Sequence, residues 1–243
     1  MKYELSNINM NYSNKSFSLK DNINEVKFVT TLNTELLLKS IEDEKLFKIL
    51  NSKNSIITVD GQWILFALKR KYRNLDIVKN SGSDLIYSIT KEASIAKKKV
   101  LLLGALPDSN CLAVAKLKEL YSYDDIYGFS PSFSSYPFSE DFIQSIKETI
   151  TNVKPHIIIT AFGVPKQEYW AYDNKEYLEK TGVEHVLFFG GAIDMVAGKF
   201  KRVPKIFQVV GLEGLYRLFL EPKRIKRYYK LVKIVPLIIF NKL

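Results

Sequence analysis

Cysteines, histidines and long apolar runs are all scarce in this sequence of 243 residues. The single cysteine, Cys111, excludes an internal disulfide framework and fits a reducing compartment. The two histidines, His156 and His185, each flank an apolar run, and no His/Cys cluster indicates a metal site. No stretch approaches the roughly 20 apolar residues of a membrane-spanning helix, and residues 1–7 have no apolar segment typical of a signal peptide. We therefore expect a cytosolic protein whose histidines are structural.

The positive charge of the chain is concentrated at one end. Residues 195–243 contain twelve Lys or Arg and two acids, Glu213 and Glu221, which accounts for the whole net charge of +10. Residues 1–194 balance, with 24 basic and 24 acidic groups. A localised positive field suits a polyanion, such as a membrane surface or phosphate groups. A solvated basic tail kept for solubility remains the alternative.

Short β-branched, apolar runs alternate with longer segments of helical periodicity. Near-continuous apolar runs are typical of parallel strands covered on both faces. Their alternation with helices predicts an α/β fold, with a Rossmann-like, mostly parallel sheet and helices on both faces. The expected strands are residues 27–31, 55–59, 100–104, 157–162 and 185–190, with a weaker one at 125–128. The expected helices are residues 35–50, 62–72, 84–96, 109–120, 139–151 and 166–179.

The chain divides into three parts on these grounds. Residues 1–26 are rich in Asn, Ser and Lys and stay unassigned. Residues 27–203 form the Rossmann-like core that would carry the chemistry. Residues 204–243 form a basic helical appendage. Pro204 and Pro222 suit the first positions of two helices in that appendage. Its last apolar residues are too few to span a bilayer, but with the neighbouring basic residues they fit the headgroup region of an anionic membrane. An ordinary amphipathic helix packed on its own domain is the alternative.

Asp60 is the main candidate for catalysis. In open α/β sheets, ligands bind beyond the carboxyl ends of the strands, and Asp60 directly follows the expected strand at 55–59. A carboxylate there can act as a general base that takes a proton from an attacking hydroxyl. Because Asp60 also precedes a helix, the alternative is an N-cap. Thr31 and Asn33, at the end of the first expected strand, would bind ligand hydroxyls or else shape a turn.

Two glycine-containing segments follow the last two expected strands. In the first, Gly163 ends a strand, and Gln167 and Glu168 fall in the first turn of a helix whose free N–H groups suit phosphates. Glu168 has a second interpretation, as an acid that complements the helix dipole. In the second segment, Gly191 precedes Asp194, which would bind a ribose or uracil or else cap a helix.

Three arginines of the appendage complete the candidate site. Arg224 and Arg227 are three residues apart and share a face of one helix, and Arg217 lies before it. Guanidinium groups pair bidentately with phosphate oxygens, so they can stabilise a departing diphosphate in place of a metal ion. The expected strand ends carry no Asp-x-Asp loop. The pattern favours metal-free chemistry.

Several of these segments together resemble the WecG/TagA/CpsF glycosyltransferase family (family 26). They occur in the family's order over about residues 28–229, and the ordered set is far more specific than any one piece. Lys79, where the family often has arginine, and Gly214, where it usually has tryptophan, depart from the pattern and leave the donor sugar open. The matching pieces are Thr31-Leu-Asn33, Thr58-Val-Asp60-Gly61, Gly82-Ser-Asp84-Leu85, Leu103-Gly104, Gly163-Val-Pro165-Lys-Gln167-Glu168, Gly190-Gly-Ala-Ile-Asp194 with Ala197-Gly198, Lys201-Arg202-Val-Pro204, Gly211-Leu-Glu213, Tyr216-Arg217-Leu, Glu221-Pro222-x-Arg224 and Arg227-Tyr228.

The resemblance implies an inverting, metal-independent transferase with no cofactor. Its members move N-acetylmannosamine, or a related N-acetylhexosamine or uronic acid, from a UDP-sugar to an undecaprenyl-diphosphate-linked acceptor. They serve teichoic acid, capsule or exopolysaccharide synthesis. By position, the resemblance implies that Asp60 is the general base and that Thr31 and Asn33 are a neighbouring active-site pair. It also implies that Gln167 and Asp194 belong to the donor pocket. The arginines that would close over the diphosphate are Arg217, Arg224 and Arg227.

The resemblance also implies a cytoplasmic enzyme that is peripheral on the anionic inner face of the bacterial cell membrane, with no nucleic-acid partner. Its oligomeric state, whether monomer or homo-oligomer, stays open. The alternative function is a non-catalytic nucleotide- or nucleic-acid-binding Rossmann-like protein, which the basic tail suggests. Against it, the basic residues adjoin apolar and aromatic ones, a composition that fits lipid better than duplex DNA. A degenerate family member that acts as a scaffold is a third hypothesis.

Overall fold

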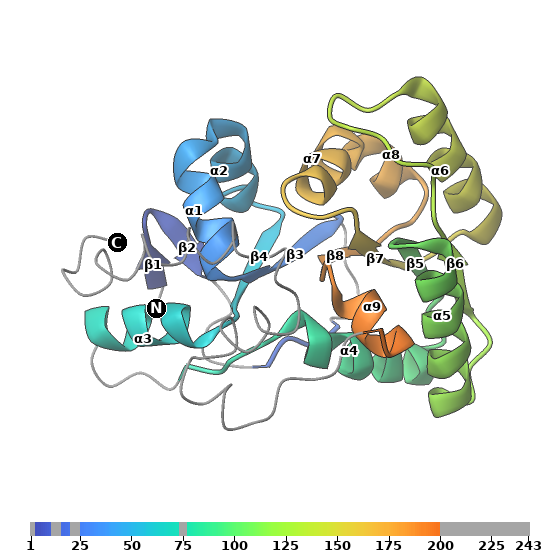
Figure 1. Cartoon of the computed structure of the whole chain (residues 1–243), viewed down its shortest axis with the longest axis horizontal. Helices are drawn as coiled ribbons and strands as arrows, with labels where there is room; N and C mark the ends of the chain where they lie inside the picture. The colour runs from blue at the N-terminus through green and yellow to red at the C-terminus, as the bar shows by residue number, and fades with distance from the viewer. Residues whose placement is uncertain (1–2, 11–15, 20–24, 73–76, 200–243) are drawn as a thin grey trace.

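A six-stranded parallel sheet with helices on both faces forms the centre of the structure (Figure 1). This computed structural model describes residues 3–10, 16–19, 25–72 and 77–199. The strand order is β4-β3-β8-β7-β5-β6, and every neighbouring pair is parallel. The predicted α/β class with a Rossmann-like sheet is confirmed. The predicted appendage, residues 204–243, lies outside the described residues.

The strands form where the sequence has short β-branched and apolar runs. Every residue of β5 and β8 is buried, as expected for strands covered on both faces. All six predicted strands are present, and their ends differ from the prediction by no more than two residues. The strands are β3 (Lys27–Leu32), β4 (Ser55–Val59), β5 (Val100–Gly104), β6 (Ile126–Phe129), β7 (Ile157–Ala161) and β8 (His185–Phe188).

The face of the sheet on which a helix lies depends on the direction in which its connection crosses the sheet. Connections toward the β4 edge carry helices on one face, drawn above the sheet in Figure 1, and connections toward β6 carry helices on the other face. Crossovers of uniform hand produce this pattern. Among the helices described, none has the length and apolar character needed to cross a bilayer. The upper helices are α1 (Thr34–Glu42), α2 (Glu44–Leu50), α6 (Glu140–Val153), α7 (Lys166–Asp173) and α8 (Lys175–Lys180), and the lower ones are α3 (Gln62–Lys71), α4 (Gly82–Ala96), α5 (Pro107–Tyr121) and α9 (Ala192–Ala197).

Two segments predicted as single helices are each divided in two. The first is interrupted at Asp43, whose extended backbone (φ −130°, ψ 100°) ends α1. The Asp43 side chain accepts a 2.9 Å hydrogen bond from the Leu46 N–H and so caps α2. Such a cap contributes ~1 kcal/mol, and helical periodicity alone does not reveal it. The second segment is interrupted at Asn174, between α7 and α8. The predictions of continuous helices over 35–50 and 166–179 are therefore wrong at these two positions.

Three clusters of buried side chains hold the layers together. One packs α4, α5 and α9 on the sheet, another packs α6, α7 and α8 on the opposite face, and the third surrounds β4 with α1, α2 and α3. Trp170 of α7 is 2% exposed and is the largest of the fully buried side chains among the described residues. Removing an aromatic side chain of this kind from a core costs about 3–5 kcal/mol, so Trp170 fixes the helix that follows β7.

The N-terminal segment that the sequence left unassigned contains a hairpin. β1 (Tyr3–Leu5) and β2 (Ile8–Met10) pair antiparallel. Ser6 and Asn7 between them have φ values of 48° and 61°, which is the geometry of a two-residue hairpin turn. Apolar side chains of the hairpin are buried in the cluster around β4. The hairpin therefore covers the edge of the sheet at β4, which would otherwise expose apolar surface.

Candidate active site

The polar residues singled out in the sequence lie around one edge of the sheet. Because all six strands are parallel, their carboxyl ends meet at this edge. β3 is followed by helices on the upper face, whereas its neighbours β4 and β8 are followed by α3 and α9 on the lower face (Figure 1). Where connections diverge in this way, the loops separate and leave the crevice in which α/β proteins bind ligands. Because the helices alternate between the two faces at every step across this sheet, the divergence singles out no one strand, and it is the predicted residues that place the candidate site along the ends of β4, β3, β8 and β7.

Asp60 lies beside the end of β3. The two strands are in register as far as Leu32 and Val59, and the Asp60 N–H donates a 2.9 Å hydrogen bond to the Leu32 carbonyl oxygen. The N-cap of α3 is Gly61, whose φ of +83° favours glycine, and the cap has no side-chain hydrogen bond. The alternative of an Asp60 N-cap is therefore wrong. Asp60 is half-buried at the edge of the sheet.

Asn33 and Thr31 have different surroundings. Asn33 Oδ1 accepts a 3.0 Å hydrogen bond from the Leu36 N–H, so Asn33 is the N-cap of α1. The cap uses only the amide oxygen, and within the described part of the chain the two N–H donors of the Asn33 amide have no partner. Thr31 pairs with Thr58 across the β3–β4 ladder and is 7% exposed. Thr31 thus lies below the edge on which Asn33 and Asp60 sit.

The segment from Gly163 to Glu168 forms the loop after β7 and the start of α7. Gly163 has a φ of +81°, and its carbonyl accepts a 3.2 Å hydrogen bond from the Gln167 N–H. Gln167 and Glu168 are each only 1% exposed, and Gln167 Nε2 donates to Glu168 Oε1 at 3.1 Å. Neither Gln167 Oε1 nor Glu168 Oε2 has a hydrogen-bond partner among the described residues. Both predicted ligand-binding side chains thus lie beneath the surface of the loop.

Burial changes the acidity of Glu168. Desolvation raises the pKa of its carboxyl to about 7, although the Gln167 hydrogen bond and the positive charge of Lys39 act in the opposite direction. Because a carboxyl with such a pKa is about half protonated near neutral pH, Glu168 is a poor fixed charge for a helix dipole. It can instead donate or accept a hydrogen bond, according to its protonation state.

The segment after β8 brings Gly191 and Asp194 to the same edge. Gly191 is the N-cap of α9 and has no side-chain cap bond, and Asp194 lies inside the first turn of that helix, half-buried. The alternative of an Asp194 N-cap is therefore wrong. A Cβ added to Gly82, at the start of α4, would come within 3.1 Å of Phe189 Cβ. The glycine at position 82 thus allows α4 to pack against the segment that carries Gly191.

A model of the Glycosyl transferase WecG/TagA/CpsF family matches residues 1–243, which is the whole chain. The chain belongs to this family. The family is one of glycosyltransferases. Of the predicted site residues, the structure places Thr31, Asn33, Asp60, Gly163, Gln167, Glu168, Gly191 and Asp194 at or just below the carboxyl edge, while Arg217, Arg224 and Arg227 lie outside the described residues.

The two histidines of this family member have structural surroundings. His156 Nδ1 accepts a 3.1 Å hydrogen bond from the Lys99 N–H. His185 begins β8, at the opposite edge of the sheet, and is 1% exposed. Burial lowers the pKa of His185 to about 4, so its ring is neutral at physiological pH. Within residues 3–10, 16–19, 25–72 and 77–199, no group of three His, Cys, Asp or Glu side chains is arranged to hold a metal ion.

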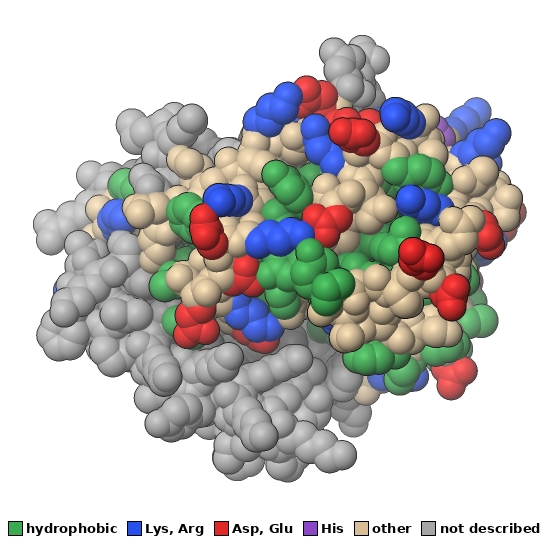
Figure 2. Space-filling model, turned by 90° about the horizontal axis from the view of Figure 1, so that it is seen from above, with side chains coloured by type: hydrophobic (Ala, Val, Ile, Leu, Met, Phe, Trp, Pro, Cys, Tyr) green, Lys and Arg blue, Asp and Glu red, His purple; other side chains and the backbone are tan. Residues whose placement is uncertain are grey.

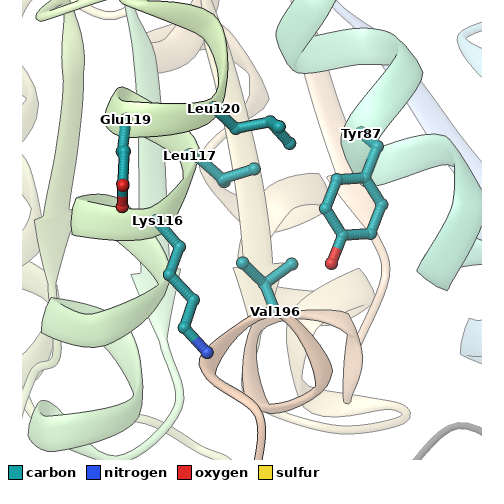
Figure 3. Close-up of a pocket in the computed structure, with 6 residues that line it drawn as sticks. All are labelled: Tyr87, Lys116, Leu117, Glu119, Leu120 and Val196. Atoms are coloured by element: carbon teal, nitrogen blue, oxygen red, sulfur yellow. The ribbon is translucent and has the colours of Figure 1, made fainter.

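A hollow of about 480 Å³ lies between α4, α5 and α9 in the lower helical layer (Figure 3). Lys116, one of its lining residues, donates a 2.9 Å hydrogen bond to the Ala197 carbonyl oxygen at the end of α9. None of the predicted site residues lines this hollow. The lining residues are Tyr87 of α4, Lys116, Leu117, Glu119 and Leu120 of α5, and Val196 of α9.

Lys39 is a functional candidate that the sequence did not single out. Its Nζ donates a 2.8 Å hydrogen bond to the Val164 carbonyl oxygen and lies 3.3 Å from Glu35 Oε1. Lys39 thereby joins α1 to the loop after β7. A lysine four residues after a glutamate on an amphipathic helix has the pattern of an ordinary surface pair, so no local signal in the sequence indicates this longer-range contact.

Proposed function

We propose that this family member is an inverting, metal-independent glycosyltransferase. It moves N-acetylmannosamine, or a related N-acetylhexosamine or uronic acid, from a UDP-sugar to an undecaprenyl-diphosphate-linked acceptor, in the synthesis of teichoic acid, capsule or exopolysaccharide. The observation that carries the proposal is the position of Asp60, held beside the end of β3 by its N–H bond to Leu32. Family membership supports the reaction class.

In this mechanism Asp60 is the general base. Its carboxylate accepts the proton of the acceptor hydroxyl while that oxygen attacks the anomeric carbon of the donor sugar. The bond from the anomeric carbon to the diphosphate breaks on the opposite face, so the configuration inverts and UDP leaves. A positioned base typically accelerates such a step by roughly 10²–10⁴-fold. The amide N–H groups of Asn33 are available to orient a reacting hydroxyl, because the cap of α1 uses only the amide oxygen.

The donor would lie across the ends of β3, β8 and β7. The Gln167 N–H is already bonded to the Gly163 carbonyl and Pro165 has no N–H, so the N–H groups that would meet the phosphates are those of Gly163, Val164 and Lys166. Asp194, which does not cap α9, would accept hydrogen bonds from ribose or uracil, with the flexible backbone of Gly191 beside it. Thr31, Gln167 and Glu168 lie deeper and would bind or shape the pocket from below.

The departing diphosphate carries charge that must be stabilised. Arg217, Arg224 and Arg227 would close over it and take the role that a divalent ion has in other nucleotide-sugar transferases. The basic, partly apolar segment at residues 222–243 would also bind the anionic inner face of the cell membrane, where the lipid-linked acceptor resides.

The test is a transfer assay with purified protein. A panel of UDP-sugars is incubated with polyprenyl-diphosphate-linked sugars in the presence of EDTA, and UDP release is measured. We expect release that depends on both the donor and the acceptor. Binding of UDP or of nucleic acid without any turnover would instead favour the non-catalytic alternative, and salt-sensitive binding to duplex DNA would favour its nucleic-acid form.

A further inference from the structure

A row of side-chain contacts joins α1 and α2 to α7 and to the loop before it. The partners in each contact are at least 125 residues apart in the sequence. Figure 2, which views this upper layer, shows basic and acidic side chains interspersed with hydrophobic ones across it. The contacts are Lys39 Nζ to the Val164 carbonyl oxygen at 2.8 Å, the Tyr169 hydroxyl to Asp43 Oδ2, and Lys45 Nζ to Asp173 Oδ1 at 2.7 Å.

The Lys39 contact is the member of this row that reaches the carboxyl edge. Val164 directly follows Gly163, at the end of β7, and α1 begins at its cap, Asn33, at the end of β3. Because β8 lies between β3 and β7 in the sheet, the Lys39 side chain bridges a helix and a loop that follow strands which are not neighbours. It fixes the spacing between the loop that carries Gly163 and the helix that begins at Asn33.

The carbonyl contact is stronger than the ion pair beside it. The distance from Lys39 to Val164 O is 2.8 Å, against 3.3 Å to the carboxylate of Glu35. An ion pair four residues apart on a helix contributes little. A hydrogen bond from a charged donor is roughly twice as strong as one between neutral groups. The Lys39 side chain is 27% exposed, so both of its contacts are partly shielded from solvent.

The Lys39 charge also acts on the acid beneath the loop. Glu168, 1% exposed at the start of α7, has one carboxylate oxygen hydrogen-bonded to Gln167. The titratable or charged groups that face it from the described residues are Lys39 of α1 and Tyr169 of its own helix, which donates to Asp43. Lys39 is the positive group in this set, and it lowers the pKa of Glu168 against the effect of burial.

We propose that Lys39 is a positioning residue for the sugar-nucleotide donor, which holds the Val164 carbonyl so that the loop after β7 presents its N–H groups to the diphosphate. This role rests on the proposed glycosyl transfer. Lys39 itself touches neither donor nor acceptor. Its loss would loosen the loop and weaken donor binding, while the chemistry at Asp60 would be affected less.

The test compares three variants by steady-state kinetics. Lys39→Met removes the charge and the hydrogen bond, Lys39→Arg keeps both, and Lys48→Met is the matched control, since Lys48 pairs with Glu44 four residues before it but is 69% exposed. We expect Lys39→Met to raise the KM for the UDP-sugar roughly tenfold, as the loss of one charged hydrogen bond implies, with a smaller change in kcat. The KM of Lys39→Arg should stay within about threefold of the wild-type value, and the KM of Lys48→Met should equal the wild-type value. Lys39→Gln serves as the second variant if Lys39→Met melts at a clearly lower temperature.

An NMR titration gives a readout that does not depend on turnover. The carboxyl carbon of Glu168 should titrate at higher pH in Lys39→Met, because a positive charge is lost, and at the wild-type pH in Lys39→Arg. A KM in Lys39→Met equal to that of an active wild-type protein would overturn the role of Lys39 and leave the proposed function standing. A wild-type protein that releases no UDP from any donor would overturn the proposed function itself, and the role of Lys39 with it.

Discussion

The backbone N–H of Asp60 donates a 2.9 Å hydrogen bond to the carbonyl oxygen of Leu32, one residue beyond the last paired residues of β3 and β4. This bond extends the sheet by one step at the point where the two strands send their chains to opposite faces. Asp60 is therefore held by the same rigid sheet that carries Asn33, the next residue after Leu32. A general base needs such fixed placement, because proton transfer requires the two heavy atoms to lie within about 3 Å of each other.

The raised pKa of Glu168 predicts how stability depends on pH. Its pKa of about 7 in the folded protein exceeds the ordinary 4.5, so the folded state binds the proton more tightly than the unfolded state. This stabilisation is fully present below pH 4.5 and is lost as pH rises through about 7. The Glu168→Gln variant has no carboxyl at this position to titrate, so its stability does not fall with pH for this reason. The stability of the variant relative to wild type should rise by about 2.5 kcal/mol between pH 5 and pH 8.

Urea denaturation at several pH values measures this difference. Glu176→Gln, which neutralises an exposed acid on α8, is the control and should follow wild type across the range. A Glu168→Gln difference that is the same at pH 5 and pH 8 would show that the buried carboxyl does not titrate as described.

The hydrogen bond from Tyr169 to Asp43 predicts a stability cost for its removal. Tyr169 is 8% exposed, and its hydroxyl donates to a carboxylate that also caps α2. Tyr169→Phe should lower the free energy of unfolding by about 2 kcal/mol, the range for a bond to a charged group. Tyr172→Phe, on the same helix but 41% exposed, should cost far less. Equal urea midpoints for the two variants would mean that the contact contributes nothing.

The proposed role of the appendage predicts two losses from one truncation. Deleting residues 222–243 removes Arg224, Arg227 and much of the basic charge. We expect the truncated protein to lose most transferase activity and to sediment far less with vesicles that contain anionic lipid. Arg224→Lys in the full chain should recover only part of the activity lost in Arg224→Ala, because lysine cannot pair bidentately with the diphosphate. Full activity after truncation would remove these arginines from the mechanism.

The expected independence from metal ions has a direct check. If guanidinium groups stabilise the leaving UDP, turnover should be the same in EDTA as in millimolar Mg²⁺ or Mn²⁺. A rate that rises tenfold or more when a divalent ion is added would contradict the arginine mechanism.

Much of the fold follows from local patterns in the sequence, because the apolar runs that form β5, β7 and β8 leave no alternative to burial on both faces. The breaks at Asp43 and Asn174 were missed, since neither interrupts the apolar periodicity of its segment; only Asp43 marks its break with a side-chain cap, and Asn174 makes none. The N-terminal hairpin was also missed. Its strands have only three residues each, too few to show alternation.

The candidate site was predicted in part. Sequence order places Asn33 and Asp60 after strands, and the parallel sheet then brings them to one edge. The capping alternatives for Asp60 and Asp194 were wrong, because in each case a glycine occupies the N-cap. Neither the burial of Glu168 nor the reach of Lys39 to Val164 could be predicted, because both depend on contacts between segments far apart in the chain.

The central claim is that Asp60 takes the acceptor proton, and Asp60→Asn tests it most directly. The asparagine keeps the size of the side chain and the backbone bond to Leu32 but removes the base. Asp108→Asn is the matched control, because Asp108 is an exposed acid in the first turn after β5, at the same edge of the sheet. With saturating UDP-sugar and lipid-linked acceptor, we predict that Asp60→Asn lowers kcat by roughly 10²–10⁴-fold. The Asp60→Asn variant should still bind UDP with a Kd near that of wild type. The control variant Asp108→Asn should have the kcat of wild type. A kcat for Asp60→Asn within a few-fold of wild type would contradict the account.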